Sequence, residues 1–388
     1  MKKKICVITG ARAEYGLLKP LLEKIDKDVE SELQLVVTGM HLSPEFGLTY
    51  KDIENDGYTI YEKVEILLGS DTPIGISKSM GLGMIGFAEV YGRLKPDLIL
   101  VLGDRYEIFA AVSAAAVTRI PVAHLHGGEI TEGAFDEGFR HSITKMSYLH
   151  FTSTEEYRKR VIQLGEHPDR VFNVGAIGVD NINNMKLLSK KELEESIGFE
   201  FGQKTALVTF HPVTLENQTS KEQFENILKA IDEFEELKII FTKSNADTDG
   251  RIINSMMDNY VDQNKDKAGA FVSMGQLRYL SAMRYVDIVV GNSSSGIIEA
   301  PSFKIPTINI GDRQKGRIQA KSVINCKPLK NDIIGSINKA LSKDFRESLI
   351  HIKNPYGNDD VSYNILKTIK KYLFNNSFNI KKGFYDIS

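Results

Sequence analysis

Short, uniformly apolar runs recur along this chain and alternate with segments of helical periodicity. Residues 5–8, 98–102 and 205–210 are such runs, and each is followed within a few residues by glycine, acid or histidine. A run that is apolar throughout predicts a strand covered on both faces. Alternation with helices predicts βαβ units in a parallel sheet. Because the pattern restarts near residue 205, after a glycine-containing junction at 175–178, we expect two such domains.

The composition limits the function. The 388 residues suggest two domains, with three possible, and 42% hydrophobic residues can fill their cores. A net charge of −2 lacks the basic excess of a nucleic-acid-binding protein. Cys6 and Cys326 lie far apart, which predicts free thiols in a reducing compartment. The apolar run at 5–8 is too short for a signal peptide or a membrane span. We therefore expect a cytoplasmic protein with neither nucleic-acid nor membrane partners.

Acids and histidines gather after two neighbouring predicted strands of the first half. Asp104 follows the run 98–102, His126 and Glu129 follow the run 120–123, and Asp136 comes soon after. Six carboxylates and three imidazoles lie between residues 104 and 141. In proteins with parallel sheets, ligands bind beyond the carboxyl ends of the strands. Carboxylates that crowd together raise one another's pKa, so one can hold a proton as an acid while another acts as a base. For any single residue a helix cap or a turn is the alternative, but the cluster favours acid/base chemistry.

The second half contains a candidate anion site in the sequence Gly-Asn-Ser-Ser-Ser-Gly at 291–296. Small residues let backbone N–H groups approach an anion, and a following helix would point its positive end at it. Glu299 could then bond ribose hydroxyls. The alternative is a serine-rich helix cap with Glu299 favouring the helix dipole.

Cations and a histidine support a phosphate site. Arg12 follows the first glycine turn and could grip a phosphate through both guanidinium nitrogens. His211 ends the run 205–210, and the loop 311–317 carries three cations, Arg313 among them. A surface role for Arg12 and a structural role for His211 are the alternatives. Together with the serine loop, these residues predict a nucleotide diphosphate in the second domain. The residues alone therefore indicate a nucleotide-sugar enzyme.

Motifs along nearly the whole chain resemble the hydrolysing UDP-N-acetylglucosamine 2-epimerases of bacterial sialic acid synthesis. They are TGARAEYG (9–16), VTGMHL (37–42), VLGDRYEIF (101–109), HLHGGE (124–129), residues 136–157, TFHPVT (209–214), SNADT (244–248) and residues 291–317. The resemblance implies a GT-B type α/β fold, with two Rossmann-like doubly wound domains and a cleft between them. We expect the domains at 1–174 and 175–365, a C-terminal segment (366–388) that crosses back, and homodimers or homotetramers.

The implied reaction converts UDP-N-acetylglucosamine and water to N-acetylmannosamine and UDP. UDP leaves by anti elimination with the C2 proton, and the resulting 2-acetamidoglucal is hydrated. The resemblance implies neither a metal nor another cofactor. It places catalytic carboxylates at Asp104 and Asp136 and an active-site arginine at Arg140. The residues expected to bind UDP are Arg12, His211, Ser293, Ser294, Ser295, Gly296, Glu299 and Arg313.

One position departs from the family pattern. Many relatives carry a carboxylate where this chain has His126, so that acid/base role falls to His126 or to Glu129. The competing functions are the same chemistry on UDP- or GDP-2,4-diacetamido-2,4,6-trideoxyglucose for legionaminic acid, and a non-hydrolysing 2-epimerase. A GT-B glycosyltransferase is a further competing function, and it would need a binding site for the acceptor molecule. A non-catalytic sensor would still respond to its ligand after replacement of Asp104 or Asp136.

Overall fold

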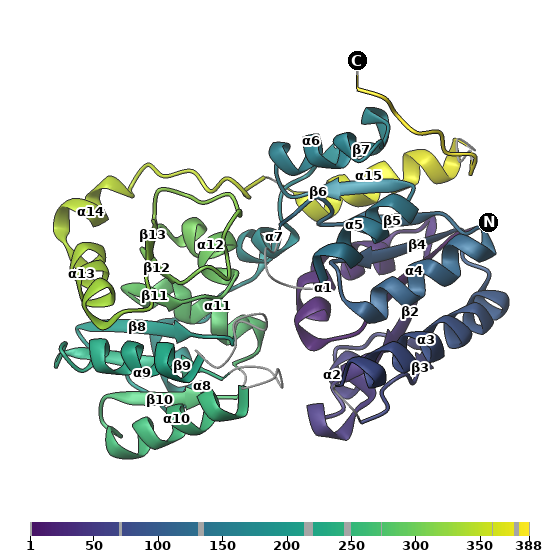
Figure 1. Ribbon diagram of the computed structural model, residues 1–388. Helices are drawn as coiled ribbons and strands as arrows, with labels where there is room; N and C mark the ends of the chain where they lie inside the picture. Colours follow the sequence, from purple (N-terminus) through teal and green to yellow (C-terminus); the bar gives the residue numbers. More distant parts are fainter. Residues whose placement is uncertain are drawn as a thin grey trace. The chain divides into compact units, whose positions relative to one another are not determined.

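The computed structural model describes residues 2–69, 72–130, 136–212, 220–243, 250–272, 274–358, 360–375 and 380–387. Glu132 of the carboxylate cluster and the motif at 244–248 lie outside the described residues. The chain divides into two compact units (Figure 1). Unit 1 comprises residues 1–129, 135–181 and 358–388, and unit 2 comprises 130–134 and 182–357.

Unit 1 is built on a parallel sheet. Its described strands are β1 (Lys3–Thr9), β2 (Ser31–Thr38), β3 (Ile60–Val64), β4 (Leu98–Leu102), β5 (Val122–Leu125), β6 (Leu149–Thr152) and β7 (Val171–Asn173). They lie in the order β3-β2-β1-β4-β5-β6-β7. Alternate side chains of β4 enter different cores: Leu98 and Leu100 pack in one cluster, and Ile99 and Val101 in another. This burial on both faces explains the uninterrupted apolar run.

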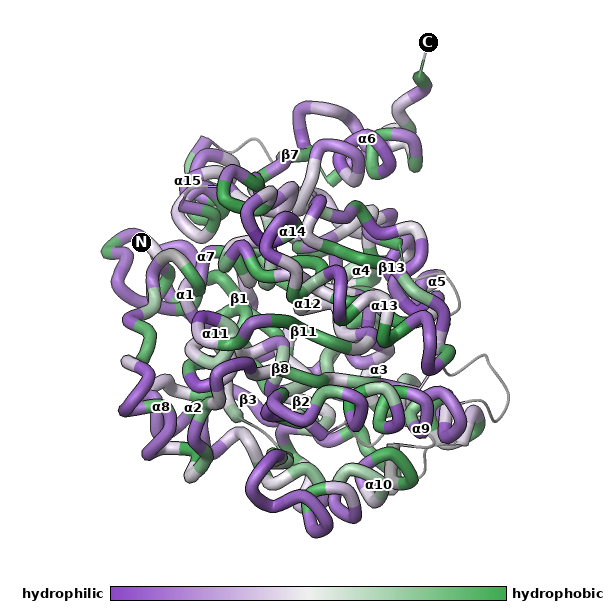
Figure 2. The backbone as a smooth tube through the Cα atoms, turned by 90° about the vertical axis from the view of Figure 1, so that its left-hand side faces the viewer, coloured by the Kyte–Doolittle hydropathy of each residue, from purple (hydrophilic) through white to green (hydrophobic). Residues whose placement is uncertain are grey.

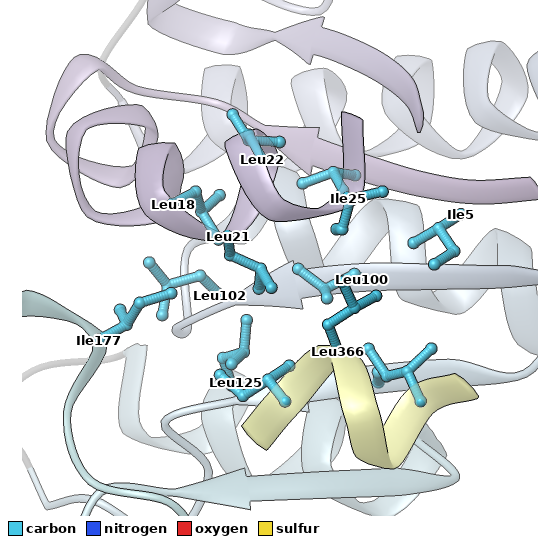
Figure 3. Close-up of a cluster of buried hydrophobic side chains, with 14 of the residues drawn as sticks. Ile5, Leu18, Leu21, Leu22, Ile25, Leu100, Leu102, Leu125, Ile177 and Leu366 are labelled. Carbon is cyan, nitrogen blue, oxygen red and sulfur yellow. The ribbon is translucent and has the colours of Figure 1, made fainter. Parts of the chain in front are cut away.

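Helices cover both faces of this sheet. They are α1 (Arg12–Lys27), α2 (Tyr50–Asn55), α3 (Pro73–Leu94), α4 (Tyr106–Thr118), α5 (Asp136–Met146), α6 (Glu155–Gln163) and α15 (Val361–Phe374), with 3-10 turns at Gly39–Leu42, Pro44–Phe46 and Pro168–Arg170. Leucines of α1 meet Leu100 of β4 and Leu366 of α15 on one face (Figure 3). On the other face, Phe87 of α3 and Ile108 of α4 pack against the sheet.

The C-terminal helix α15 is part of unit 1. Its apolar side packs beside α1 in the same core cluster. Asp180 lies in α7 (Ile177–Asn184) and is fully buried. Its two carboxylate oxygens accept the backbone N–H groups of Val361 and Ser362 at 3.0 and 3.1 Å. Asp180 therefore caps the first turn of α15, whose N–H groups have no partner inside the helix.

Unit 2 repeats the doubly wound pattern. Its described strands are β8 (Lys204–Thr209), β9 (Leu237–Thr242), β10 (Ala268–Phe271), β11 (Ile288–Gly291), β12 (Thr307–Ile310) and β13 (Val323–Cys326), in the order β10-β9-β8-β11-β12-β13. Its helices are α8 (Lys190–Ile197), α9 (Ser220–Ile231), α10 (Gly250–Gln263), α11 (Gly275–Tyr285), α12 (Ser295–Ile298), α13 (Lys330–Leu341) and α14 (Lys343–Ser348), with a 3-10 turn at Ala300–Phe303. Figure 2 shows the hydrophobic character of β8 and β11.

The strand orders locate the switch points of both sheets. Strand order reverses between β1 and β4 in unit 1, and between β8 and β11 in unit 2. The connections leave these paired strands in opposite directions, which opens a crevice at their carboxyl ends where ligands bind. Within the described residues, no helix is both long and apolar enough to cross a membrane.

Candidate active site

Arg140 ties together the acidic residues at the switch point of unit 1. It lies on α5 with only 3% of its surface exposed. Its Nη2 donates to the Asp104 carboxylate, which follows β4. Its Nη1 donates to Glu137 at 2.7 Å and to the backbone oxygen of Glu129 at 2.9 Å. One buried guanidinium thus connects the loops after β4 and β5 with α5, and it brings together Asp104 and Arg140, two of the residues predicted for the site.

Asp136 is the first residue of α5, and its surroundings perturb its carboxyl. Burial, and after it the charge of Asp104, raise the pKa of its carboxyl to about 6. A carboxyl that titrates near neutral pH can accept and release a proton during one catalytic cycle. Asp104, by contrast, is paired with Arg140. Two nearby carboxyls in unlike environments can take different acid/base roles.

His126 and Glu129 form a pair of their own. His126 Nδ1 lies 3.0 Å from Glu129 Oε1, and its Nε2 accepts the backbone N–H of Ile177 at 3.3 Å. The ring therefore carries its proton on Nδ1 and donates it to Glu129. Ser153 Oγ donates to the same carboxylate oxygen at 2.8 Å. His126 has a backbone φ of 65°, which costs a non-glycine residue energy and often marks a functional loop.

A second set of charged residues, Glu14, Arg105 and Glu107, lies at this switch point. The sequence did not predict a role for them. Arg105 donates to Glu107 from Nη2 at 2.9 Å and from Nε at 3.1 Å, and Glu107 is fully buried. Glu14 of α1 accepts the backbone N–H of Gly10 at 2.7 Å. Burial raises the pKa of Glu14 to about 7, although the charge of Arg105 opposes this rise. The Asp-Arg-Tyr-Glu sequence was the available signal for Arg105 and Glu107.

His124 has a structural role. Its Nε2 donates to the backbone oxygen of Gly103 at 2.8 Å, and its Nδ1 accepts from the Thr144 hydroxyl at 3.1 Å. Burial lowers its pKa to about 3. The ring is therefore neutral, and it connects the end of β5 with the turn after β4 and with α5.

Asn292 organises the switch point of unit 2. Its amide accepts the backbone N–H of His211 and donates to the His211 backbone oxygen, both at 2.7 Å. The Asn292 backbone oxygen accepts from Arg313 Nη1 at 3.0 Å and from Gln314 Nε2 at 2.8 Å. The ends of β8, β11 and β12 are thereby joined. Sequence reasoning gave Asn292 no separate role, and its place between Gly291 and the serines was the only signal.

His211 is neutral in this environment. Burial, and after it the charge of Arg313, lower its pKa to about 3. No hydrogen-bond partner of its Nδ1 is found among the described residues. A neutral imidazole with an unsatisfied ring nitrogen can bind a polar ligand by hydrogen bonding, which suits binding better than acid catalysis.

The helix expected after the serine loop is only one turn long. α12 spans four residues and is followed directly by a 3-10 turn. The N–H groups of Gly296 and Glu299 bond to the backbone oxygens of Ser293 and Ser295. The expected helix dipole is therefore weak, and an anion would rely on the serine hydroxyls and the start of the loop. The short helix follows from Pro301, which has no N–H to continue it.

Gly291 explains why this loop can approach β8 so closely. Its φ is 133°, and a Cβ atom at this position would lie 1.9 Å from the backbone oxygen of Thr209. A side chain is therefore excluded. The three cations of the loop 311–317 separate: Arg313 turns to Asn292, whereas Lys315 and Arg317 line a pocket of about 590 Å³. Arg12 is exposed at the start of α1.

The described residues contain no group of three or more His, Cys, Asp or Glu side chains that could hold a metal ion. The chemistry available in unit 1 is proton transfer by carboxyls beside a fixed guanidinium. The chemistry available in unit 2 is hydrogen bonding by serines, a neutral histidine and Arg313. Such a combination suits an enzyme that acts on a nucleotide sugar.

Comparison with known proteins agrees with this class. The family model described as UDP-N-acetylglucosamine 2-epimerase matches residues 23–370. The chain is 44% identical to the GDP/UDP-N,N'-diacetylbacillosamine 2-epimerase (hydrolyzing) of Campylobacter jejuni, with 100% of both chains covered. It is 41% identical to the polysialic acid biosynthesis protein P7 of Escherichia coli, with 99% of this chain and 98% of the relative covered.

Solved structures share the fold. A Methanocaldococcus jannaschii UDP-GlcNAc 2-epimerase in complex with UDP-GlcNAc and UDP superposes with a TM-score of 0.78 at 23% identity, covering 95% of this chain and 99% of the other. The MnaA–UDP structure from S. aureus gives 0.79 at 20% identity, covering 99% and 100%. The predicted fold, two Rossmann-like domains of GT-B type, is confirmed.

The chain belongs to the UDP-N-acetylglucosamine 2-epimerase family, and it is an enzyme that acts on nucleotide sugars. The resemblance noted in its motifs is confirmed at this level.

Proposed function

We propose that this enzyme is a hydrolysing 2-epimerase that converts UDP-N-acetylglucosamine and water to N-acetylmannosamine and UDP. The observation that carries the proposal is that two neighbouring carboxyls of unit 1, those of Asp136 and Asp104, lie in different environments. Asp136 has a pKa of about 6, beside Asp104, which Arg140 holds in an ion pair. The 44% identical relative is named as a hydrolyzing 2-epimerase, which supports a hydrolysing reaction here.

The proposed reaction has two steps. In the first, a carboxylate takes the proton from C2 while the bond from C1 to the diphosphate oxygen breaks, and a C1–C2 double bond forms. In the second, water adds its oxygen to C1, and a proton enters C2 from the opposite face, which inverts that carbon. We assign the proton transfers to Asp136 and Asp104. Arg140 donates a hydrogen bond to the Asp104 carboxylate and orients it.

The remaining site residues position the substrate or the catalytic groups. His126 and Glu129 bond to each other, which favours a role in holding the loop after β5 over direct proton transfer. UDP is proposed to bind His211, the loop of Ser293, Ser294, Ser295 and Gly296, Glu299 and Arg313, with Arg12 contributing a phosphate contact. The proposal places the enzyme in the cytoplasm as a homodimer or homotetramer, where it would supply N-acetylmannosamine for sialic acid synthesis.

A second candidate substrate is the UDP- or GDP-linked 2,4-diacetamido-2,4,6-trideoxyglucose of the legionaminic route. The Campylobacter relative favours this candidate, because its name gives GDP/UDP-N,N'-diacetylbacillosamine as the substrate. The reaction would be the same, because both sugars carry an acetamido group at C2. The sugars of the two candidates differ at C4, where an acetamido group replaces the hydroxyl, and at C6, where a methyl group replaces the hydroxymethyl group.

Proton NMR of the products tests the proposal. UDP-N-acetylglucosamine and the 2,4-diacetamido sugar nucleotides are each incubated with the enzyme without added metal. We expect N-acetylmannosamine and UDP from the first substrate at the higher kcat/KM. Faster turnover of a diacetamido substrate would assign the enzyme to the second candidate. Formation of UDP-N-acetylmannosamine would contradict the hydrolytic half of the proposal.

A further inference from the structure

The last described residues of the chain belong to unit 1 and lie beside the end of α6 (Figure 1). Lys382 lies in this C-terminal segment, residues 380–387. Its Nζ donates to the backbone oxygen of Lys145 at 2.6 Å and to that of Ser147 at 2.7 Å. Lys145 belongs to the last turn of α5, and Ser147 follows that helix. The final carbonyl groups of a helix have no partner within it, so Lys382 caps the C-terminal end of α5.

A buried carboxylate holds the Lys382 ammonium in place. Glu166 is fully buried, and its Oε1 lies 2.8 Å from Nζ of both Lys382 and Lys145. Its Oε2 lies 3.0 Å from His150 Nε2. Burial alone would raise the pKa of Glu166, but the bonds from His150 and the two lysines outweigh it and lower the pKa to about 2. Glu166 is therefore a permanent anion that two lysines share.

Apolar and backbone contacts seat the same segment. The Phe384 ring covers Gly165 so closely that a Cβ atom at this position would lie 2.3 Å from the ring. The backbone N–H of Tyr385 donates to the Gly165 oxygen at 2.9 Å, and the Tyr385 ring meets His167 edge-on at 5.1 Å. The contacts of Lys382 are thus part of a packed attachment and do not depend on one flexible side chain.

The helix that Lys382 caps carries the proposed chemistry at its other end. α5 begins at Asp136 and presents Arg140 one turn later. A cation at a helix C-terminus also interacts favourably with the helix dipole. We propose that the C-terminal segment 380–387 positions α5 for catalysis, with Lys382 as the positioning residue that holds Asp136 and Arg140 in register with Asp104. The catalytic part of this inference rests on the proposed function.

Lys382→Met tests the inference because it keeps an unbranched side chain of nearly the same length and removes the ammonium donors. We expect kcat to fall on the order of tenfold, as expected for catalytic groups displaced by a fraction of an ångström. The KM should change little, because the groups proposed to bind UDP lie mainly in unit 2. Lys382→Arg keeps the charge and the donors and should restore most of kcat. The matched control is Lys371→Met, which replaces an exposed lysine on α15.

Hydrogen–deuterium exchange supplies a readout that needs no substrate. In Lys382→Met, peptides covering 136–146 should exchange faster than in wild type, and those from unit 2 should not change. Unchanged kcat and unchanged exchange of α5 would overturn the inference. A loss of kcat that is fully explained by a loss of folded protein would also overturn it. A loss of kcat that Lys382→Arg fails to restore would overturn it as well. If wild type turns over no sugar nucleotide while the exchange result holds, the proposed function fails and the attachment of α5 stands.

Discussion

Asp136 is the residue on which the proposed chemistry depends most. Asp136→Asn keeps the size and polarity of the side chain and removes its capacity to accept a proton. We predict that turnover falls by a factor on the order of 10² or more, the loss expected for general acid/base catalysis. The affinity for UDP, measured by titration calorimetry, should stay within the error of wild type. Full activity in the variant would remove Asp136 from the mechanism.

The same residue should affect stability in a pH-dependent way. The pKa of Asp136 is raised from 3.8 to about 6 in the folded protein. Between these values the folded state holds a proton that the unfolded chain has lost, so the free energy of unfolding falls as the pH rises through this window. Asp136→Asn should therefore be more stable than wild type at pH 7, by on the order of 1 kcal/mol, and equally stable below pH 4.

Denaturant unfolding at both pH values measures this difference. Asp26→Asn, on the exposed side of α1, serves as the control and should show no pH-dependent gain. A variant that is less stable than wild type at pH 7 would show that Asp136 contributes to folding as well as to chemistry.

The sequence revealed some residues of the unit 1 site and not others. Asp104 and Arg140 could be proposed because Asp104 follows an apolar run and both residues lie in motifs that match a known pattern. Glu14 and Glu107 could not, because a buried carboxylate looks the same in sequence as one on a helix surface. Only the fold turns Glu14 inward against Gly10. The sequence left an acid/base role open between His126 and Glu129; in the fold these two side chains contact each other, and both ring nitrogens of His126 are engaged.

Among the elements, the buried strands were predictable, and so was the short edge strand β7, but the two edge strands of unit 2 were not. β4 is apolar throughout, and β1 and β8 each contain an apolar run, because helices cover both faces of their sheets. β10 and β13 each have four residues at an edge of the unit 2 sheet, and their partly exposed side chains leave no apolar run to recognise. The C-terminal residues after α15 have no period, since their contacts with unit 1 are made by a few individual side chains.

The N-terminal cap of α15 offers a test at the scale of an element. Asp180→Ala removes both acceptors for Val361 and Ser362 and leaves their N–H groups buried. We predict a loss of about 2 kcal/mol in the free energy of unfolding, the upper end for a lost cap because the group is buried. Denaturant unfolding measures it, with Asp26→Ala as the control. A change no larger than that of the control would mean that α15 is held by its apolar face alone.

UDP should stabilise unit 2, which contains most of the residues proposed to bind it. If UDP binds through His211 and the serine loop, its addition at about 100 times its Kd should raise the free energy of unfolding of unit 2 by about 2.7 kcal/mol. Asp136→Asn should keep this gain, and His211→Ala should need more UDP to reach it. Thermal unfolding with increasing UDP measures both. Equal responses of His211→Ala and wild type would remove His211 from the nucleotide site.

For the molecule as a whole, the central claim is that UDP release is coupled to removal of the C2 proton. The most direct measurement uses UDP-N-acetylglucosamine deuterated at C2 and follows both UDP and the label. We predict that each UDP released is accompanied by loss of the deuterium to water, and that the N-acetylmannosamine formed carries a solvent proton at C2. Release of UDP with the deuterium retained on N-acetylglucosamine would show simple hydrolysis at C1 and would contradict the account.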